Sequence, residues 1–485
     1  MAQEVPDDLR EFIEAAKNVG QWREIKKADW NLEIGALIEA TAELVPQPPL
    51  LLFDDIRGYP AGFRVLGLSF ASYKRVALAL GLPVEKSKLE LVRLASRKIR
   101  SAQPIAPQEV SRAPVTENMM TGDQVDLFRF PALHSHEGDG GRYLGTGDVV
   151  INADPETGFV NMGTYRMQLH QRNLLGLWMS PGQDGRMICA KYWERGKSCP
   201  ITATFGQDPL TFMASNTKIP WGTSEIDYVG GLRGKPLEII RGPVTGLPIP
   251  AHAEIAVEGE VPPPGEEARN EGPFGEWPGY YSGGSIGTGE PQPVVRIKAV
   301  YHRNDPILQD ETPLWPGAYP MDLSLRAGLL WDQLESMGVQ DVVGVYDYSR
   351  YLWVVAIKQR YGGHAKQVGH AALAAGASAR DGRYVVVVDD DIDPTSLKEG
   401  LWAMMTRVDP KTDIEIIEGS WSTPLDPRMP PEKKTTRDYT NNRAVFYAVR
   451  PFAWREKFPK VSRAARQLRE TVVAKYREIL PFPPI

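Results

Sequence analysis

The sequence is poor in cysteine and has no long hydrophobic run. Its 485 residues include two cysteines, Cys189 and Cys199. Two are too few for a disulfide framework, and they do not form the Cys-x-x-Cys pair of many metal and redox sites. We therefore expect two reduced thiols in a cytoplasmic protein. No apolar run approaches the roughly 20 residues that cross a bilayer, and the acidic, polar N-terminus predicts no signal or transit peptide.

An excess of positive charge is also missing. The formal net charge is −5, and acidic and basic residues are mixed along the chain. Because nucleic-acid-binding proteins present a basic face, we expect no nucleic-acid partner, and we expect no membrane partner. With 42% apolar residues, the chain is long enough for two or three domains that need no disulfide or metal to stabilise them.

Hydrophobic periodicity divides the chain into three regions and predicts an α/β (α+β) fold. Residues 1–115 alternate helical and strand patterns and end in a proline-containing linker. Residues 116–318 are dense in glycine and proline and carry recurring β-type runs, which indicates a mostly antiparallel β domain. Residues 319–485 again alternate helices and strands. The predicted N-terminal elements are helices at 9–16, 32–44 and 73–80, a strand at 50–53 and a linker at 101–114.

The chain ends in a segment typical of an amphipathic helix, 459–480. Pro459 stands at its start, a position where proline is tolerated because its missing N–H would be unpaired anyway. Six residues share one face of this helix. We expect the helix either to dock on its own domain or to reach a second subunit. The face consists of Val461, Ala465, Leu468, Val472, Tyr476 and Ile479.

Two glutamates five residues apart mark the most informative loop, Glu271-Gly-Pro-Phe-Gly-Glu276-Trp-Pro-Gly-Tyr-Tyr. Its glycines let the backbone approach whatever the loop faces. Paired acids near a basic partner can have their pKa values driven apart, which gives one charged and one protonated carboxyl. From composition alone, a surface turn with solvated glutamates is the favoured interpretation.

A second stretch, residues 160–168, alternates as a strand does. That pattern places Asn161, Gly163 and Tyr165 on one face and Arg166 on the other. An arginine on the inner face of a domain is costly unless an acid or an anion pairs with it. An exposed arginine on an edge strand is an equally good interpretation of the same pattern.

Other motifs are weaker when taken alone. Ser224-Glu225 can cap a helix or supply an oxygen ligand to a hard cation. The glycines of 283–289 precede a strand rather than a helix, so a flexible loop is favoured over a phosphate-binding loop. The acids of 389–393 are better explained as a strand end that caps the next helix than as a metal cluster. His134 and His136 lack nearby partners for zinc, so a loop role is favoured.

Together these stretches resemble the UbiD family of prenylated-FMN-dependent decarboxylases and carboxylases, over roughly residues 10–480. The resemblance implies an N-terminal α/β domain, a central split β-barrel that binds prenylated flavin, and a C-terminal α/β oligomerisation domain that ends in helix 459–480. It also reverses the interpretation of the two glutamates. The matching stretches are 139–143, 161–168, 224–230, 271–276 with 279–281, 359–366 and 387–393.

The resemblance also implies site residues and cofactors. Arg166, Glu271 and Glu276 match the family's catalytic network. Asn161 and Glu225 match ligands of a divalent cation, Mn²⁺ or Mg²⁺, that binds the flavin phosphate, with K⁺ nearby. The family's third ligand is a histidine, but 178–186 contains none, so Gln183 or Asp184 takes its place. The residues expected to bind prenylated FMN are Asn161, Thr164, Tyr165, Arg166, Gln168, Gln183, Ser224, Glu225 and Lys434.

The implied reaction is reversible, non-oxidative decarboxylation of an aromatic, heteroaromatic or α,β-unsaturated carboxylic acid. Loss of CO₂ from an sp² carbon leaves an unstable carbanion unless a cofactor accepts the electrons. The resemblance implies a covalent substrate–prenylated flavin adduct, with Glu276 as the proton donor and Arg166–Glu271 as the pair that tunes it. Expected partners are the small acid, CO₂, a flavin prenyltransferase as cofactor supplier, and further copies of the chain in a homodimer or homohexamer.

Three alternatives remain open at this point. The protein can act as a carboxylase in the reverse direction, as part of a larger complex, because one site serves both directions. It can be a non-catalytic flavin-binding scaffold, although the presence of Arg166, Glu271 and Glu276 argues against that. An ordinary flavin oxidoreductase would need a nicotinamide site, and the sequence shows none.

Overall fold

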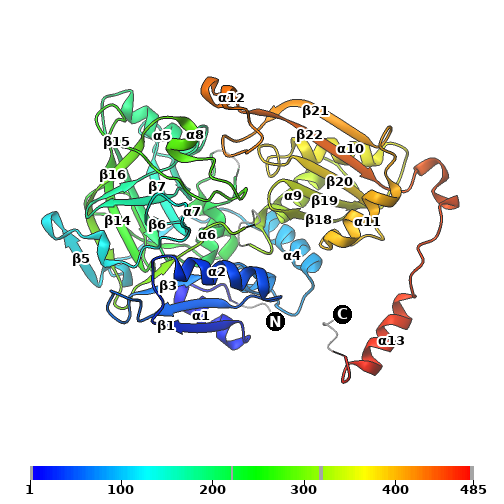
Figure 1. Cartoon of the computed structure of the whole chain (residues 1–485), viewed down its shortest axis with the longest axis horizontal. Coiled ribbons are helices and arrows are strands. Elements are labelled where there is room, and N and C mark those ends of the chain that lie inside the picture. The colour runs from blue at the N-terminus through cyan, green and yellow to red at the C-terminus, as the bar shows by residue number, and fades with distance from the viewer. Residues whose placement is uncertain (1–3, 220–221, 316–320, 481–485) are drawn as a thin grey trace.

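The computed structural model describes residues 4–219, 222–315 and 321–480. Figure 1 shows an N-terminal region below, a central β-rich region on the left and a C-terminal α/β region on the right. The predicted domain boundary at 318–319 lies outside the described residues. None of the described helices combines the length and apolar character that crossing a membrane requires.

The N-terminal region is a small sheet with helices packed on it. The strand order is β1-β2-β3-β17, and β17 (Ile307–Gln309) joins this sheet after the chain has left the central region. Helix α1 forms as predicted, since its apolar face is buried and the Asp8 side chain accepts a hydrogen bond from the Glu11 N–H. The elements are α1 (Leu9–Asn18), β1 (Trp22–Lys26), α2 (Glu33–Leu44), β2 (Leu50–Asp54), β3 (Arg64–Gly67) and α3 (Tyr73–Ala79).

Helix α4 (Lys88–Ser101) connects the N-terminal and C-terminal regions and was not among the predicted helices. Ser87 and Glu90 form a capping box at its start, which is a sequence signal for a helix N-terminus. Its buried residues Leu91, Val92, Ala95 and Ile99 pack in the largest hydrophobic cluster, and the helix contacts α9 (Leu325–Ser336). The N-terminal region therefore shares its core with the C-terminal region.

The central region is a curled antiparallel half-barrel, in agreement with the predicted β domain. Its strand order is β6-β9-β10-β16-β14-β11-β7-β8, with β5 and β15 paired to β16. The strands are β5 (Asn118–Thr121), β6 (Tyr143–Gly145), β7 (Asp148–Ala153), β8 (Val160–Gly163), β9 (Met167–Gln171), β10 (Leu174–Gly176), β11 (Cys199–Phe205), β14 (Ile255–Val261), β15 (Ala268–Arg269) and β16 (Gln292–His302).

Short helices and a small sheet surround the half-barrel. The glycines of 283–289 form α8 (Gly284–Thr288) rather than the predicted flexible loop, because the Gly287 and Gly289 N–H groups bond to carbonyls of Gly283 and Ser285. The remaining elements are α5 (Asp184–Trp193), α6 (Pro209–Ser215), α7 (Glu225–Arg233), β4 (Gln108–Glu109), β12 (Glu238–Arg241) and β13 (Pro248–Pro250).

The C-terminal region is a sheet with helices on both faces, as its alternating pattern predicts. Val385 and Val387 pack with Val368 of helix α10 (His364–Ala374), whereas Val386 and Val388 pack with Ala403 of helix α11 (Leu397–Arg407). This double burial explains the continuous apolar run. The strand order in the sheet is β18-β19-β20-β22-β21. Along the chain, the elements are β18 (Val342–Tyr348), β19 (Leu352–Ile357), α10 (His364–Ala374), β20 (Tyr384–Asp389), α11 (Leu397–Arg407), β21 (Ile414–Trp421), α12 (Pro431–Thr436) and β22 (Thr440–Ala448).

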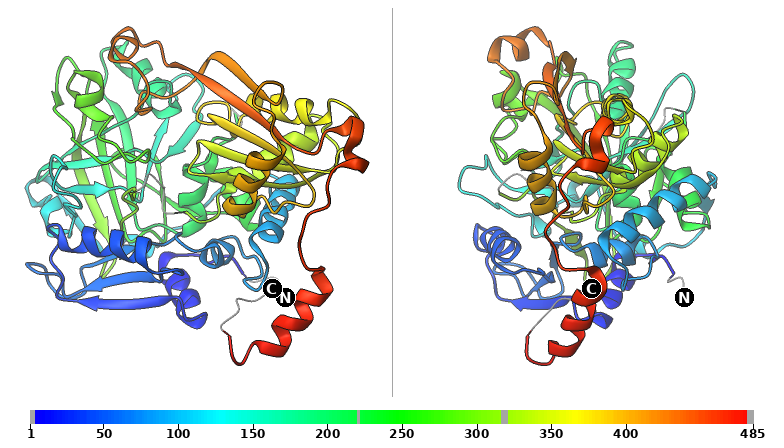
Figure 2. Two further views of the ribbon diagram at one scale, coloured as in Figure 1. Left: turned by 45° about the vertical axis from the view of Figure 1, so that its right-hand side comes forward. Right: turned by 90° about the vertical axis from the view of Figure 1, so that its right-hand side faces the viewer.

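The terminal helix is shorter than predicted and does not dock on its own domain. Helix α13 spans Arg466–Tyr476 instead of 459–480, and residues 461–465 are non-helical. Its predicted apolar face is exposed, as at Leu468, Val472 and Tyr476. Figure 1 and the left view of Figure 2 show it away from the body of the molecule. A helix without tertiary packing is marginal in length and stability, which explains the later start.

Candidate active site

Arg166, Glu271 and Glu276 form one buried hydrogen-bonded group, here called the triad. Arg166 Nε and Nη2 each donate to Glu271 at 2.8 Å, and Nη1 donates to Glu276 Oε1 at 2.5 Å. Their relative exposures are 8%, 0% and 5%. A surface turn with solvated glutamates is therefore wrong, and the bidentate pair is among the strongest that side chains form.

Arg166 lies at a break between strands, which corrects the prediction of one strand through 160–168. Strand β8 pairs with β7, whereas β9 pairs with β6 and β10. The three residues between them change partners, so the chain turns there. The Arg166 carbonyl accepts a hydrogen bond from the Trp178 N–H at 2.9 Å. This turn directs the guanidinium toward the loop that carries the two glutamates.

The glutamate loop is held by the stretch at 139–143 and by Gln168. Gln168 Nε2 donates to the Gly140 carbonyl at 3.1 Å, and its Oε1 accepts from the Gly272 N–H at 3.0 Å. A Cβ on Gly140 would lie 2.0 Å from the Gly272 oxygen, so only glycine fits there. The Tyr143 hydroxyl donates to Glu271 Oε1 at 3.3 Å. Glu271 is thus positioned by two separate stretches of chain.

The pKa shifts of Arg166 and Glu276 indicate different roles for these two members of the triad. Burial alone lowers the pKa of the Arg166 guanidinium, but the charges of Glu271 and Glu276 outweigh it and raise that pKa. Burial raises the pKa of the Glu276 carboxyl, against the charge and hydrogen bond of Arg166, which lower it. Arg166 therefore stays charged, while Glu276 is a carboxyl that holds a proton more readily than glutamate in water.

The triad borders a cavity with aromatic walls, here called the triad cavity. Phe274 lies over the Arg166 guanidinium, 4.3 Å from ring centroid to Cζ. Trp178, Trp277 and Leu425 form a separate apolar cluster beside it. The cavity is lined by Thr146, Thr164, Arg166, Trp178, Ser180, Gln183, Asn216, Phe274, Glu276, Trp277, Glu311, Pro313, Arg350, Arg380 and Leu425. Flat apolar walls around a few converging polar groups suit a small planar ligand.

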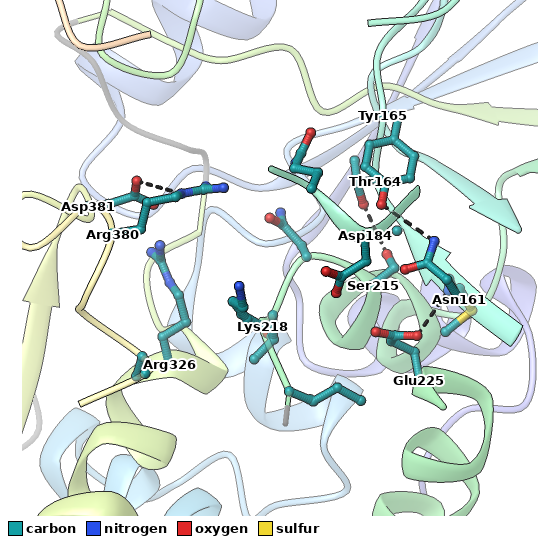
Figure 3. A pocket seen from close by; sticks show the side chains of 18 of the residues that line it. Asn161, Thr164, Tyr165, Asp184, Ser215, Lys218, Glu225, Arg326, Arg380 and Asp381 are labelled. Atoms are coloured by element: carbon teal, nitrogen blue, oxygen red, sulfur yellow. Dashed lines mark hydrogen bonds and ion pairs between the residues drawn. The ribbon is translucent and has the colours of Figure 1, made fainter. Parts of the chain in front are cut away.

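A second cavity, here called the basic pocket, lies between the central and C-terminal regions. Figure 3 shows Lys218, Arg326 and Arg380 on one side and Asn161 and Glu225 on the other. Arg326 and Arg380 are held by salt bridges to Asp347 and Asp381. The basic pocket adjoins the triad cavity, since five residues line both. These shared residues are Thr164, Gln183, Asn216, Arg350 and Arg380.

The oxygen ligands expected for a cation converge in the basic pocket. Glu225 is the first residue of α7, and its Oε2 accepts from the Met162 N–H at 2.9 Å. Burial raises the pKa of Glu225 to about 7. The side-chain amide nitrogen of Asn161, Nδ2, donates to Asn152 Oδ1 at 3.0 Å, so the side-chain amide oxygen of Asn161 is available to a ligand in the pocket. A buried carboxylate beside an amide oxygen fits a hard divalent cation.

Asp184 fits the third ligand position better than Gln183 does. The Gln183 Oε1 already accepts a hydrogen bond from the Ser180 N–H at 2.7 Å. Burial raises the pKa of Asp184, opposed by Lys218 and Arg380, and Figure 3 shows its carboxylate in the same pocket as Glu225. The assignment of either residue to a metal stays a prediction.

Three residues predicted to bind the cofactor make other contacts in this structure, and their assignment to the cofactor stays a prediction. The Ser224 hydroxyl donates to the Val160 carbonyl at 2.9 Å, and Gln168 holds the glutamate loop. Lys434 Nζ donates to the Ser282 carbonyl at 3.3 Å, near enough to Glu276 for its charge to act there. None of the three is among the residues that line the two cavities. Thr164 and Tyr165 do line the basic pocket, where the Thr164 hydroxyl lies 2.9 Å from Ser215 Oγ.

Sequence reasoning missed most of the basic pocket. Lys218, Arg326, Arg350 and Arg380 come from separate loops and helices, and single basic residues carry no local pattern. Glu311 was also missed, although Asp310-Glu311 follows a strand end directly. Acidic residues directly after an apolar strand were the available signal for Glu311.

The weaker motifs resolve into structural roles. Asp389 and Asp391 pair with Arg407 at 2.9 and 2.8 Å, and Ser396 rather than an aspartate caps α11. His134 Nδ1 lies 2.8 Å from Asn31 Oδ1, which ties its loop to the N-terminal region. Within the described ranges there is no group of three or more His, Cys, Asp or Glu side chains that could hold a metal.

Comparison with family models identifies all three regions. Residues 13–95, 108–316 and 321–448 match the N-terminal, Rift-related and C-terminal domains of the 3-octaprenyl-4-hydroxybenzoate carboxy-lyase family UbiD. This chain belongs to the UbiD family. As a UbiD protein it is a carboxy-lyase, and the resemblance drawn from its motifs is confirmed.

Curated relatives of this UbiD protein are decarboxylases. The phenolic acid decarboxylase of Bacillus subtilis is 33% identical over 437 residues, which cover 87% of this chain and 89% of the relative. The pyrrole-2-carboxylic acid decarboxylase of Pseudomonas aeruginosa is 31% identical over 451 residues, which cover 88% of each chain.

Solved structures of UbiD-class enzymes match the whole chain. The open form of vanillic acid decarboxylase from Sedimentibacter hydroxybenzoicus has a TM-score of 0.81 and 29% identity, covering 98% of this chain and all of that one. HmfF from Pelotomaculum thermopropionicum, solved with FMN, has a TM-score of 0.81 and 26% identity, covering 97% and 100%. An evolved dimeric HmfF was solved with prFMN.

Proposed function

We propose that this protein decarboxylates an aromatic, heteroaromatic or α,β-unsaturated carboxylic acid with prenylated FMN as cofactor. The observation that carries the proposal is the triad: Arg166 is bonded to both Glu271 and Glu276 at the wall of a cavity that adjoins the basic pocket. The relatives named for phenolic and pyrrole-2-carboxylic acids support the substrate class.

When bound, prenylated FMN supplies a covalent electron sink for the electron pair that departing CO₂ leaves behind. Thr164 and the two arginines that line both cavities, Arg350 and Arg380, are placed to contact a ligand that extends from one cavity to the other. Lys218, Arg326 and Arg380 suit the phosphate. Asn161, Glu225 and Asp184 suit Mn²⁺ or Mg²⁺ beside it, whereas no described residues are assigned to K⁺.

Glu276 is proposed to deliver the proton that replaces CO₂. Its raised pKa favours the protonated form, and Arg166 stabilises the carboxylate that remains after transfer. A general acid whose pKa is raised from its ordinary value toward the working pH is better able to both give and regain a proton in one cycle. Glu271 holds Arg166 through two hydrogen bonds and so fixes its orientation. The same groups serve carboxylation when CO₂ is abundant.

The test is CO₂ release by protein produced together with a flavin prenyltransferase. We expect turnover of at least one acid in a panel of hydroxybenzoic, pyrrole-, furan- and indole-carboxylic and acrylic acids, and none from protein produced without the prenyltransferase. Prenylated flavin that remains bound without release of CO₂ from any acid in the panel would favour a flavin-binding scaffold instead.

We also propose that the protein is a homodimer or homohexamer. Two exposed apolar stripes support this: Leu397, Leu401 and Met405 on α11, and Leu468 with Val472 on α13. Exposed stripes of this kind mark protein interfaces. A chain that ends at residue 458 should have a lower mass by light scattering than the full chain. An unchanged mass would argue that α13 takes no part in assembly.

A further inference from the structure

Glu311 is a buried carboxyl in the triad cavity with one oxygen that has no partner. It lies just after β17, the strand that joins the N-terminal sheet. Its backbone N–H donates to Thr146 Oγ1 of the central region at 2.9 Å. Its relative exposure is 1%. Oε1 accepts from Gln309 Nε2 at 3.0 Å, whereas Oε2 has no hydrogen-bond partner among the described residues.

Among the described residues, the other buried carboxylates have hydrogen-bond partners or lie away from the two cavities. Glu258 is fully buried, and its two oxygens accept from the Thr245 and Tyr301 hydroxyls at 2.6 and 2.7 Å. Asp148 has unpartnered oxygens but is not among the residues that line the triad cavity or the basic pocket. Glu311 therefore combines an unused hydrogen-bonding oxygen with a place in the cavity wall.

A buried carboxyl oxygen without a hydrogen-bond partner destabilises a folded protein, because it has lost its bonds to water and gained none in return. A ligand that completes its hydrogen bonds removes that destabilisation, so the group favours ligands with a matching polar atom. The aromatic walls of the same cavity, Trp178, Phe274 and Trp277, suit the flat part of such a ligand. Arg166 and Glu276 supply the chemistry, and Glu311 is left for recognition.

The protonation state of Glu311 limits which polar group of a ligand can form a hydrogen bond with it. Burial raises the pKa of Glu311 to about 8, although the side chains of Gln309 and Ser69 and the charge of Arg75 favour the ionised form. At neutral pH the carboxyl is then mostly protonated and donates through one oxygen, and when ionised it only accepts. A hydroxyl group satisfies both states because it donates and accepts. A ring N–H satisfies only the ionised state.

We propose that Glu311 recognises a hydroxyl group on the aromatic ring of the substrate acid. This inference rests on the proposed decarboxylation and narrows its substrate to hydroxylated aromatic acids. Glu311 acts as a specificity-determining residue: it selects the ring, while Glu276 handles the proton.

The experiment compares benzoic acid with 2-, 3- and 4-hydroxybenzoic acids in the holoenzyme. We measure kcat/KM from CO₂ release and Kd by isothermal titration calorimetry. The wild type should prefer one hydroxybenzoic acid over benzoic acid by at least about tenfold in both quantities. In Glu311→Met, which keeps the length and removes the polar atoms, the ratio should fall to within about threefold of one, with flavin content unchanged.

Two further variants separate recognition from general damage. Glu311→Gln keeps a donor and an acceptor and should retain most of the preference. Glu258→Gln changes a buried glutamate outside the cavities and should leave the ratio between acids unchanged even where it lowers Tm. A misfolded site would reduce turnover of all acids equally and would not move the ratio. If Glu311→Met does not fold, Glu311→Asp, which withdraws the carboxyl by one methylene, should lose the preference instead.

The outcomes distinguish this inference from the proposed function. A wild-type preference that persists in Glu311→Met, or a wild type that does not discriminate between hydroxybenzoic and benzoic acids, overturns the role of Glu311. Absence of CO₂ release from every acid overturns the decarboxylase proposal, and the binding ratios then still decide whether Glu311 reads the hydroxyl.

Discussion

The triad and the basic pocket differ in how they are built. The triad comes from the central region alone, and its three side chains are buried and bonded to one another. The basic pocket is shared between two regions: Asn161, Asp184 and Glu225 are central, whereas Arg326 and Arg380 belong to the C-terminal region. A site fixed inside one domain is preorganised, whereas a site between domains depends on how they meet. Changes in the first should therefore affect chemistry, and changes in the second should affect ligand retention.

The largest expected effect is on turnover, from a change in the triad. Glu276→Gln cannot supply a proton but keeps the shape of the side chain and a hydrogen-bond acceptor for Arg166. CO₂ release should fall by about 100-fold or more, with bound flavin, measured by absorbance, near the wild-type level. Near wild-type turnover would contradict Glu276 as the proton donor. Loss of flavin from this variant would contradict the expectation that changes in the triad affect chemistry and not ligand retention.

Next in size is the loss of cofactor from a change in the basic pocket. Glu225→Ala removes a buried carboxylate beside Asn161 and should lower flavin and metal content together, by about tenfold. Ser224→Ala is the matched control, because the Ser224 hydroxyl bonds to the Val160 carbonyl. Absorbance and metal analysis of purified protein measure both contents. Equal occupancy in the two variants would contradict a cation at Glu225.

A smaller effect separates the two candidates for the third ligand. Asp184→Asn should weaken Mn²⁺ binding by about tenfold, whereas Gln183→Ala should change it less, because the Gln183 oxygen already serves the Ser180 N–H. Mn²⁺ titration of the cofactor-bound protein gives both affinities. The reverse order would assign the position to Gln183.

The last expected effect is on stability rather than on turnover or binding. Burial raises the pKa of Glu311 to about 8 in the folded protein, with a smaller contribution from the charge of Asp310 and against the charge of Arg75. In an unfolded chain the pKa is about 4.3. The folded state therefore holds an extra proton between these values, and the resulting stabilisation is lost as pH rises toward 8. Glu311→Gln lacks this titration, so its Tm should rise relative to wild type between pH 5 and 9. A constant Tm difference would mean that Glu311 does not titrate there.

Periodicity predicted the elements whose packing is local. Helix α1 and the run at 385–388 formed as expected, because each pattern records which faces are buried. Helix 459–480 was overestimated, since its apolar face meets no surface of its own chain. The prediction of one strand through 160–168 was wrong. The segment forms two strands because β8 pairs with β7 and β9 pairs with β6, and local sequence does not show which strands pair in the tertiary fold.

The candidate site needed more than pattern. Composition favoured a solvated turn for Glu271 and Glu276, and it was the family resemblance that identified them with Arg166. Nothing local in the sequence shows that Glu271 is fully buried. The position of Glu311 depends on the pairing of β17 with the N-terminal sheet, and the basic pocket forms only where the central and C-terminal regions meet. Both are consequences of the tertiary fold.

A crystal structure of protein produced together with a flavin prenyltransferase tests the central claim most directly. The account predicts one prenylated FMN that spans both cavities, with its phosphate among Lys218, Arg326 and Arg380 and its ring beside Arg166 and Glu276. A cofactor bound elsewhere, or a ring remote from the triad, would contradict it.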